Sequence, residues 1–432
     1  MQPAGKIAAG PIPRVLIIGA GFAGINAARA LRHSDVRVVI VDKKNHHTFQ
    51  PLLYQVALAV LAPAEIASPV RTVLRGQKNI EIIMGEIVSF DLTGKRAMMK
   101  DGNSIEYDYL IVATGSTHSY FGKEEWAAAA PGLKTIEDAI EIRRRILLAF
   151  ELAEKQVVEG VPNPTPLNFV IVGGGPTGCE LAGAISDITR RYMTEDFHHI
   201  DPAMAKIILL EGAPHVMSAY PPDLQESARK QLEQLDVEVH TNTRVTNIEP
   251  GAVYVGEKKI PAAVVMWAAG VQASPLGKLL GVPITRSGQV TVDTECNPPG
   301  HPEIFVLGDL AHFEQDGHPL PGLAPVAIQM GQWVPKAIGA DMAQEQRKPF
   351  HYWDKGSMAT IGRNRAIAQI GKVHLSGFIA WLAWLLVHIF FLIGFRNRVL
   401  VMLEWAWTYF AVQRGSRLIT GNTTLVGWGA AN

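Results

Sequence analysis

The fold of the first part of the chain depends on the stretch RVLIIGAGFAG, residues 14–24. A short apolar run typical of a strand is followed directly by a glycine-rich turn and then by the helical pattern INAARALRHS. The segment VRVVIVD at 36–42 is the next strand. Together these segments predict a βαβ unit, and its short crossover favours a parallel sheet.

Three glycines in this turn, Gly19, Gly21 and Gly24, form the pattern GxGxxG. The first permits the turn, the second lets a pyrophosphate approach the backbone, and the third allows helix and strand to pack closely. The N-terminus of the helix offers amides and a positive dipole end to phosphates. Asp42 ends the next strand, where a carboxylate can bind a ribose diol. A structural glycine turn is the alternative, and the carboxylate favours a dinucleotide site.

A second strand, turn and helix begin at Asn168 and read NFVIVGGGPTGCELAG. The fingerprint glycines are Gly173, Gly175 and Gly178, and Glu211 ends the following strand, KIILLE. No arginine lies close to Glu211 in the sequence, and its carboxylate would repel the 2′-phosphate of NADPH. We therefore expect this unit to prefer NADH, with a solvent-facing Glu211 as the alternative. Two such units in one chain indicate one flavin site and one nicotinamide site.

The composition excludes several classes of protein. With 48% hydrophobic and 19% charged residues, the 432-residue chain is too apolar for a disordered protein and too mixed for a polytopic membrane protein. Its 40 basic and 40 acidic residues balance, which argues against a broadly electrostatic nucleic-acid binder. The two cysteines, Cys179 and Cys296, exclude a disulfide framework and a CxxC redox pair, so we expect both to be structural.

Two further segments complete a family resemblance. YDYLIVATGS contains Thr114 and Gly115 after a predicted strand, and EIFVLGDL ends a buried strand with Asp309. With the two fingerprints, they make the chain similar to the two-dinucleotide-binding-domain flavoproteins. In that family the N-terminal unit binds FAD and the inserted unit binds NAD(P)H. The resemblance implies that the ATG segment closes the junction between the domains and that the aspartate reaches the ribityl or phosphate groups of the flavin.

Longer segments narrow the resemblance to the type II NADH:quinone oxidoreductases. They are NHHTFQPLLYQVA (45–57), TIEDAIEIRRRILLAFE (135–151), GGGPTGCELAG (173–183) and KGSMATIGRNRAIA (355–368). The resemblance covers nearly the whole chain. It implies a monotopic respiratory flavoenzyme that passes two electrons from NADH through FAD to a membrane quinone without pumping protons. The alternatives are a soluble NADH-dependent reductase of a ferredoxin-like protein and a non-enzymatic NADH-sensing flavoprotein.

The expected fold class is α/β, with two Rossmann-like dinucleotide-binding domains, the second inserted in the first. We expect the FAD-binding domain at 12–120 and 288–352 and the NADH-binding domain at 121–287. A C-terminal membrane-association region is expected at 353–432. A proline-rich segment at 158–168 marks one candidate boundary.

Two residues are predicted to be catalytic. The resemblance places Glu180 near the meeting point of nicotinamide and flavin, where it would orient the nicotinamide or relay protons. It also points to Gln329, the second glutamine of the family's AQxAxQ motif, as a candidate near the quinone head group. The first glutamine position of this motif holds Pro325. Any role of that first side chain is therefore absent or moved.

The predicted cofactor-binding residues fall into two groups. Those near the first fingerprint and its partner segments are Gly19, Gly21, Phe22, Ala23, Gly24, Asp42, Lys43, Gln55, Val88, Thr114, Gly115 and Asp309. Those near the second are Gly173, Gly175, Pro176, Thr177, Gly178, Glu211 and Gly270. Histidines occur in pairs at 46–47 and 198–199 without a third ligand at a suitable spacing, so we expect no metal site.

The segment SGFIAWLAWLLVHIFFLIGF, 376–395, lacks charged residues and is long enough to cross a bilayer. Four tryptophans within 381–407, with Arg396, Arg398, Arg414 and Arg417 around them, favour a pair of helices lying on one leaflet, with the tryptophans as a headgroup-level belt. A spanning helix and a core or dimer contact are the alternatives. Residues 1–14 lack a secretory h-region. We expect a peripheral protein on the cytoplasmic face of a bacterial inner membrane, and a homodimer is a further possibility.

Overall fold

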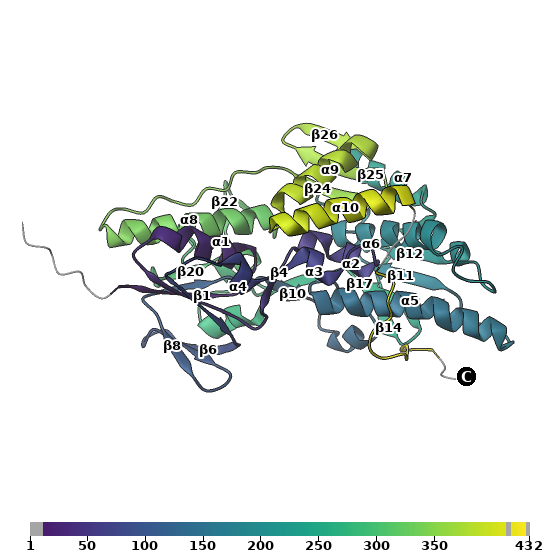
Figure 1. Ribbon diagram of the computed structural model, residues 1–432, viewed down its shortest axis with the longest axis horizontal. Coiled ribbons are helices and arrows are strands. Elements are labelled where there is room, and N and C mark those ends of the chain that lie inside the picture. Colours follow the sequence, from purple (N-terminus) through teal and green to yellow (C-terminus); the bar gives the residue numbers. More distant parts are fainter. Residues whose placement is uncertain (1–11, 412–415, 429–432) are drawn as a thin grey trace, which may run out of the picture. The chain divides into compact units, whose positions relative to one another are not determined.

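The computed structural model describes residues 12–411 and 416–428 (Figure 1). The chain forms two compact units. Unit 1 comprises Met1–His47, Ser68–Thr117 and Val271–Asp354, and unit 2 comprises Thr48–Ala67, His118–Gly270 and Lys355–Asn432. The first unit is therefore discontinuous, as predicted. The exact domain boundaries given above stay predictions.

Unit 1 is built on a five-stranded parallel sheet with the order β20-β9-β1-β2-β5. Its strands are β1 (Arg14–Ile18), β2 (Arg37–Asp42), β5 (Ile80–Met84), β9 (Tyr109–Val112) and β20 (Ile304–Val306). The helices α1 (Phe22–Ala30) and α8 (Ala324–Met342) contact each other closely. A Cβ atom at Gly331 of α8 would lie 2.3 Å from the Ala23 carbonyl oxygen of α1.

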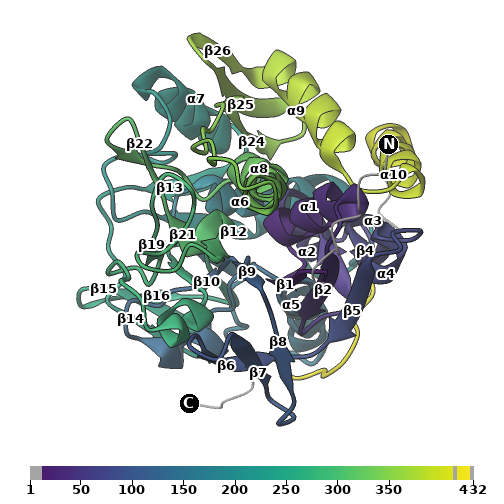
Figure 2. The ribbon, with the colours of Figure 1, turned by 90° about the vertical axis from the view of Figure 1, so that its left-hand side faces the viewer.

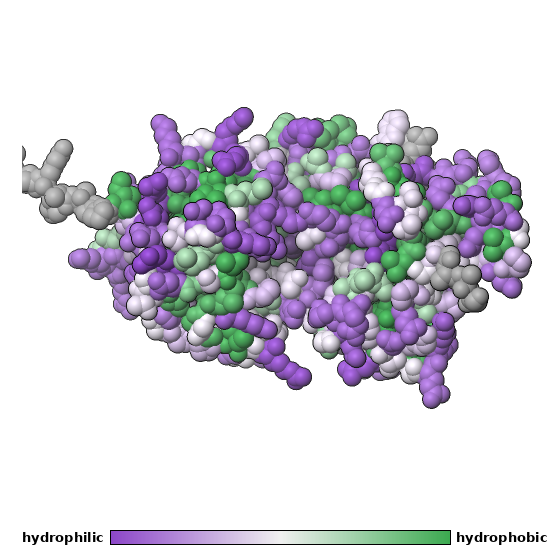
Figure 3. Space-filling view, turned by 90° about the horizontal axis from the view of Figure 1, so that it is seen from below, coloured by the Kyte–Doolittle hydropathy of each residue, from purple (hydrophilic) through white to green (hydrophobic). Residues whose placement is uncertain are grey.

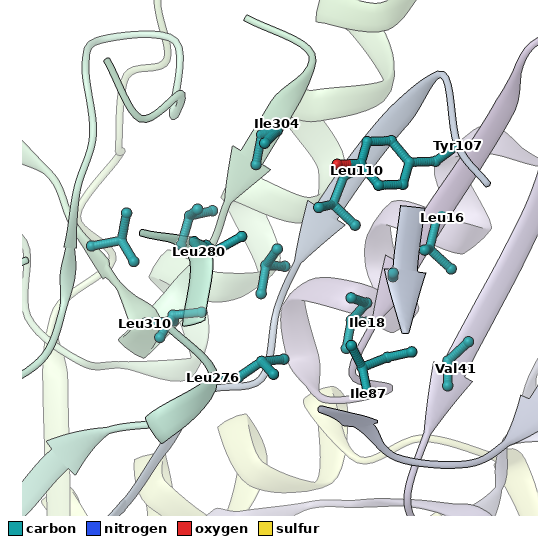
Figure 4. Packing of buried hydrophobic residues seen from close by; sticks show 14 of the residues in the cluster. Leu16, Ile18, Val41, Ile87, Tyr107, Leu110, Leu276, Leu280, Ile304 and Leu310 are labelled. Carbon is teal, nitrogen blue, oxygen red and sulfur yellow. The ribbon is translucent and has the colours of Figure 1, made fainter. Parts of the chain in front are cut away.

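The core of unit 1 lies against this sheet (Figure 4). Leu16, Val41 and Leu110 come from adjacent strands and pack with Ile304 and Leu310. All five are buried. The four that lie on strands of the parallel sheet are buried because such strands are covered on both faces and become continuously apolar. The remaining elements of unit 1 are α4 (Val70–Val73), β6 (Ile87–Asp91), β7 (Arg96–Met99), β8 (Ser104–Glu106), β18 (Val271–Ala273), β19 (Val290–Thr291), β21 (Ala311–His312), β22 (Glu314–Gln315) and β23 (His318–Pro319).

Unit 2 contains the second parallel sheet, with the order β13-β12-β11-β17. Its strands are β11 (Asn168–Val172), β12 (Lys206–Leu210), β13 (Val237–His240) and β17 (Val264–Trp267). The helices are α5 (Ile136–Val158), α6 (Pro176–Asp187) and α7 (Pro222–Glu233), and a small antiparallel sheet contains β14 (Asn247–Glu249), β15 (Ala252–Val255) and β16 (Lys258–Pro261). A π-helical turn, Ile188–Tyr192, follows α6 and takes up part of the long gap before β12.

Two segments distant in sequence complete unit 2. Residues 48–67 contribute α2 (Leu53–Ala57), which contacts α5 and α6, and α3 (Pro63–Ile66), which contacts α10. The C-terminal part contributes an antiparallel sheet of β24 (Ser357–Gly362), β25 (Arg365–Ile370) and β26 (Val373–Ser376), with the helices α9 (Gly377–Phe391) and α10 (Phe395–Ala411). Figure 2 shows α9 beside this sheet. Three short strands lie at unit boundaries: β3 (His46–Thr48), β4 (Ala67–Pro69) and β10 (Ser116–His118).

The long apolar segment 376–395 is divided between two helices. It forms α9, which ends at Phe391, and Leu392 then takes an extended conformation with ψ 130°. Within residues 12–411 and 416–428, no helix combines the length and the apolar character that spanning a membrane requires.

Residues 416–428, which we call the C-terminal strap, run back over unit 2. Arg143 of α5 donates to the carbonyl oxygen of Ser416 at 2.9 Å, and Arg144 donates to those of Asn422 and Thr424 at 2.7 and 2.8 Å. Glu141 accepts from Arg144 at 2.7 Å, which lowers the pKa of its carboxyl group. Buried arginines without enough acceptors would be costly, so the strap and Glu141 satisfy them.

Candidate functional site

The first glycine-rich turn has the geometry of a phosphate cradle. Gly19 has φ +99°, and a Cβ atom on it would lie 2.4 Å from the Ala113 carbonyl oxygen. A Cβ atom at Gly24 would lie 1.8 Å from the Gly19 carbonyl oxygen, which excludes any side chain there. At Gly21, the nearest atom to a Cβ would be 3.9 Å away. Gly19 and Gly24 are therefore required by the protein itself, whereas Gly21 leaves space in front of the helix N-terminus.

Asp42 lies at the end of β2 beside this turn. Its two carboxylate oxygens accept hydrogen bonds from the amides of Ala20 and Lys44 at 2.6 and 2.7 Å. These bonds fix the carboxylate beside the glycine turn. Two further predicted residues are exposed: Lys43 lies just after the end of β2, and Val88 lies on β6 and is 39% exposed. Phe22 and Ala23 form the first turn of α1.

The buried polar atoms of unit 1 that have no hydrogen-bond partner among the described residues include His47 Nε2 and Thr114 Oγ1. Burial lowers the pKa of His47, and its Nδ1 lies 2.9 Å from the Ala20 carbonyl oxygen. The neutral ring therefore donates through Nδ1 and keeps Nε2 as an acceptor. Two unpaired polar atoms near the turn fit a cofactor rich in hydroxyl groups. His47 was not among the predicted site residues, although it belongs to the NHHTFQ segment.

The segment with Thr114 and Gly115 and the segment with Asp309 are joined by one hydrogen bond, and the first of them contains a glycine with positive φ. Gly115 follows β9 with φ +66°, which only glycine adopts easily. Asp309 lies in a single 3₁₀ turn, Gly308–Leu310, and accepts a hydrogen bond from the Ser116 hydroxyl at 2.7 Å. Thr114 and Gly115 therefore lie in the same unit as Asp309, and a hydrogen bond joins Asp309 to the residue after Gly115.

Unit 2 repeats the geometry of the first turn. Gly173 has φ +110°, and a Cβ atom at Gly178 would lie 1.8 Å from the Gly173 carbonyl oxygen. At Gly175 there is nothing within 4 Å of a Cβ position. Pro176 and Thr177 are the first two residues of α6. Unit 2 thus offers a second cradle with the same constraints.

Glu211 occupies the position in unit 2 that Asp42 occupies in unit 1. Its carboxylate accepts from the amide of Gly174 and from the amide of Ala213, the latter at 2.6 Å. Ala20 and Gly174 are the equivalent residues of the two turns, since each follows the first fingerprint glycine. Gly270 lies after β17, and a Cβ atom there would be 2.6 Å from the Ser119 carbonyl oxygen.

A cavity of about 500 Å³ lies within unit 2, between α6 and the C-terminal helices. It is lined largely by aromatic and aliphatic side chains, with a few polar groups. Glu180 comes from α6, Gln55 from α2 and Thr360 from β24. A Cβ atom at Gly183 of α6 would lie 1.5 Å from the Ile361 carbonyl oxygen of β24. The two backbones therefore touch here, which places Glu180 and Thr360 on the same cavity.

The carboxyl group of Glu180 is held neutral at physiological pH. Burial raises its pKa to about 8, and a smaller, opposing effect comes from a hydrogen bond with the backbone of Thr360. Strongly shifted pKa values in a cleft are a sign of function, because catalytic acids need a pKa near the working pH. Glu180 can therefore hold and release a proton inside an apolar cavity.

A chain of hydrogen bonds fixes the amide of Gln55. Trp405 of α10 donates through its indole nitrogen to Gln55 Oε1 at 2.7 Å, and Gln55 Nε2 donates to the Tyr54 hydroxyl at 2.8 Å. Gln55 is 6% exposed, so the orientation of its amide is determined by these bonds. Gln55 and Glu180 thus share one cavity. Trp405 and Gly183 were not predicted as site residues, although a glycine inside a helix commonly has a packing reason.

Gln329 lies on α8 in unit 1. Its Nε2 donates to the Trp353 carbonyl oxygen at 2.9 Å, and its Oε1 accepts from the Trp353 amide at 3.0 Å. This reciprocal pair ties the chain near Trp353 to α8. Pro325, the departure from the family motif, lies in the first turn of the helix, where proline is readily accepted.

The predicted tryptophan belt is wrong for part of the C-terminal region. Trp384 is only 1% exposed and lies in the interior of unit 2, and Trp405 is half-buried and donates to Gln55, whereas Trp407 is 60% exposed. Helical spacing showed which residues share a face but not what covers that face. Cys179 and Cys296 are both buried, as expected. Arg414 and residues 1–11 lie outside the described residues.

Comparisons with known proteins agree with this geometry. Residues 13–331 match the pyridine nucleotide-disulphide oxidoreductase family, and residues 354–413 match the NDH2 C-terminal domain. Type II NADH:quinone oxidoreductase NdhA of Mycobacterium tuberculosis is 43% identical over 94% of this chain and 89% of its own length. Ndh of the same organism is 41% identical over 94% of this chain and 90% of its own length. The structure of NDH2 from Plasmodium falciparum in complex with NADH has a TM-score of 0.85 at 19% identity, covering 95% of this chain and 100% of that one.

Two glycine cradles, each with a carboxylate at the end of the next strand, define a protein of the pyridine nucleotide-disulphide oxidoreductase class. Within this class the sequence identity is decisive. The chain belongs to the type II NADH:quinone oxidoreductases.

The two glycines of the second cradle provide a matched test. Gly175→Ala adds a methyl group where the protein leaves open space, so it should weaken NADH binding severalfold without lowering the melting temperature. Gly178→Ala forces a clash with backbone and should destabilise unit 2 by about 1–3 kcal/mol or more. Titration calorimetry with NADH and thermal melts measure the two effects. Equal loss of stability in both variants would contradict the assignment.

Proposed function

We propose that this protein transfers two electrons from NADH to a quinone, with FAD bound in unit 1 and NADH in unit 2. The overall reaction converts NADH, a proton and a quinone into NAD⁺ and a quinol. When bound, FAD supplies the two-electron carrier between the two substrates. The cavity in unit 2, with neutral Glu180 and oriented Gln55 among aromatic side chains, is the observation that carries this proposal.

FAD would be held by the residues of unit 1 that fit a large polar cofactor. Its pyrophosphate would lie in front of Gly21, where the turn leaves open space, and its adenine ribose beside Asp42. The unpaired His47 Nε2 and Thr114 Oγ1 support this fit, because each is a buried atom that accepts a hydrogen bond from a hydroxyl group. Asp309 and the other cofactor-binding residues predicted near the first fingerprint are proposed to line the same site.

NADH would occupy the cradle of unit 2. The open space at Gly175 receives the pyrophosphate, and the carboxylate of Glu211, fixed by two backbone amides, binds the ribose diol. The same carboxylate would repel the 2′-phosphate of NADPH, which supports a preference for NADH. Gly270 is proposed to lie near the bound nucleotide at the end of β17.

The quinone is proposed to enter the cavity between α6 and the C-terminal helices. The lining accepts a flat, apolar head group, and Glu180 can supply a proton there because its pKa is near 8. Gln329 is kept as a second candidate near the head group, although its amide is paired with the backbone of Trp353. No protein nucleophile is required for this reaction.

The C-terminal helices are proposed to rest on a membrane leaflet. They present a set of strongly exposed apolar side chains: Ile379, Leu386, Phe390, Phe395, Leu403, Trp407 and Phe410, between 60% and 82% exposed. Over the face drawn in Figure 3, by contrast, hydrophilic and hydrophobic residues are interspersed. Large exposed apolar patches mark membrane or protein contacts, and a second copy of the chain is the competing cover. We place the anchor at the cytoplasmic face of a bacterial inner membrane, supported by the identity to a bacterial enzyme.

Anaerobic stopped-flow on the detergent-purified protein tests the proposed reaction. We expect NADH to bleach the flavin absorbance rapidly, NADPH to bleach it weakly, and a short-chain quinone to restore it. Reoxidation by a ferredoxin-like protein, with none by quinone, would transfer the assignment to the soluble reductase. Bleaching without any acceptor would favour an NADH sensor.

The raised pKa of Glu180 predicts a pH dependence of stability. The carboxyl group of Glu180 is protonated in the folded protein up to about pH 8, but in the unfolded chain it ionises near 4.5, the ordinary pKa of a glutamate. The contribution of Glu180 to the free energy of unfolding is therefore fully present at low pH and is lost as the pH rises from 4.5 toward 8. Glu180→Gln should remove this component, so the variant gains stability relative to wild type at pH 8.5 but not at pH 4. Thermal melts at both pH values measure it, and parallel curves would contradict the shift.

The same variant separates the role of Glu180 from its effect on folding. Glutamine fills the space but carries no transferable proton, so we expect slower flavin reduction by NADH or slower reoxidation by quinone. Stopped-flow resolves the two half-reactions. Unchanged rates in both would show that Glu180 only fills the cavity.

Membrane contact is tested by charging the exposed apolar face. Leu386→Glu together with Phe395→Glu removes two large side chains, each worth about 1.5–3 kcal/mol when buried, and should abolish flotation with vesicles of phosphatidylglycerol and phosphatidylethanolamine. Met204→Glu, at an apolar residue 78% exposed elsewhere in unit 2, is the control. If the double variant still floated with vesicles but no longer sedimented as a dimer, the exposed apolar face would be assigned to contact with a second copy of the chain.

A further inference from the structure

The carboxamide of Gln55 connects two segments of the cavity wall that are distant in the sequence. Trp405 of α10 donates from its indole nitrogen to Gln55 Oε1 at 2.7 Å, and Gln55 Nε2 donates to the hydroxyl oxygen of Tyr54 at 2.8 Å. All three side chains line the cavity. The backbone of Gln55 is fixed by its own turn, because its carbonyl oxygen accepts from the amides of Val60 and Leu61 at 2.8 and 3.2 Å. The orientation of the carboxamide therefore depends on the two side-chain partners.

Of these two partners, only Trp405 distinguishes the two ends of the carboxamide. One end is an acceptor oxygen and the other a donor nitrogen, whereas the indole nitrogen of Trp405 only donates. The hydroxyl group of Tyr54 can both donate and accept, so it pairs equally well with either end. A flipped carboxamide would place its NH2 group against the indole N–H and leave both donors unpaired, which is unfavourable. Trp405 therefore determines that the oxygen of Gln55 faces α10 and that the nitrogen faces the other way.

This orientation leaves one donor of Gln55 unused. The carboxamide nitrogen has two hydrogens, and one of them goes to Tyr54. Within the described part of the chain, the carboxamide makes no hydrogen bond besides those with Tyr54 and Trp405. The surroundings are mainly aromatic and aliphatic, so an occupant with a flat apolar ring and an acceptor oxygen would suit them. A quinone head group, with carbonyl oxygens on an apolar ring, has both properties.

We propose that Trp405 is a positioning residue for the quinone: it holds the carboxamide oxygen of Gln55, so that the second amide hydrogen of Gln55 is presented to a carbonyl oxygen of the quinone. This inference rests on the proposed function, because it assigns the cavity to the quinone. Trp405 lies on α10, whose outer face includes the exposed Leu403 and Trp407. The helix proposed to rest on the membrane thus also orients a polar group inside the cavity. The competing explanation is a bond that only fastens α10 to α2.

The first test removes the donor of Trp405 and keeps an aromatic ring. In Trp405→Phe the two orientations of the carboxamide become similarly available, so only about half of the molecules present the nitrogen to the quinone. KM for menadione, a methylated naphthoquinone, should therefore rise at least about twofold. Methylnaphthalene has the same rings without the carbonyl groups and should inhibit wild type and variant with the same constant. Flavin reduction by NADH, followed by anaerobic stopped-flow, should keep its rate.

The second test removes the carboxamide and then combines the two changes. Gln55→Met keeps the length of the side chain without the donor, so KM for menadione should rise about fivefold, which corresponds to one neutral hydrogen bond of about 1 kcal/mol. Adding Trp405→Phe to Gln55→Met should not raise KM further, because no carboxamide is left to orient. Trp428→Phe is the matched control, because its indole nitrogen donates to the Ala263 carbonyl oxygen and does not line the cavity.

The outcomes separate this proposal from the proposed function. A menadione KM in either single variant that equals that of Trp428→Phe would overturn the proposal. Effects that multiply in the double variant, or a parallel change in methylnaphthalene inhibition, would show that Trp405 acts by packing and not through Gln55. Loss of FAD or slow flavin reduction in Trp405→Phe would favour the bond that only fastens α10. If wild-type enzyme reduced its flavin with NADH but did not turn over any quinone, the proposed function itself would fail.

Discussion

The cavity of unit 2 depends on one contact between two backbones, that of Gly183 with the carbonyl oxygen of Ile361. Because a Cβ atom at position 183 would lie 1.5 Å from that oxygen, α6 and β24 meet with no side chain between them. The face of α6 that carries Glu180 and Asp187 is thereby pressed against the C-terminal sheet, and both residues line the cavity. A side chain at position 183 would separate α6 from the sheet beside which α9 packs.

The same kind of close backbone contact occurs at both nucleotide cradles. A Cβ atom at Gly24 or Gly178 would lie 1.8 Å from the carbonyl oxygen of the first glycine of its turn. These requirements are local, and so they could be predicted from the sequence. The strands at 14–18 and 168–172 and the helices that follow are where the apolar runs and the glycine spacing predicted them. The positions of Asp42 and Glu211 beside the turns follow from strand length alone.

What the sequence did not predict depends on contacts between distant segments. Residues 48–67 precede most of the chain, yet they pack in unit 2, where Gln55 meets Trp405. Trp384 and Trp407 both lie in apolar helices with similar patterns, but one is buried and the other is exposed. Periodicity tells which residues share a face, whereas the burial of that face is decided by partners that a linear pattern does not identify.

Unit 2 takes segments from near both ends of the chain, residues 48–67 and the C-terminal strap, and Arg143 and Arg144 bind the strap from the middle. During synthesis the ribosome therefore has to release the chain through the strap before this unit can close. Until then the residues of α2, which are all buried in the folded protein, remain exposed to water. A nascent chain stalled before residue 416 would lack the strap carbonyl oxygens that accept from Arg143 and Arg144, which makes it a natural target for chaperones and proteases.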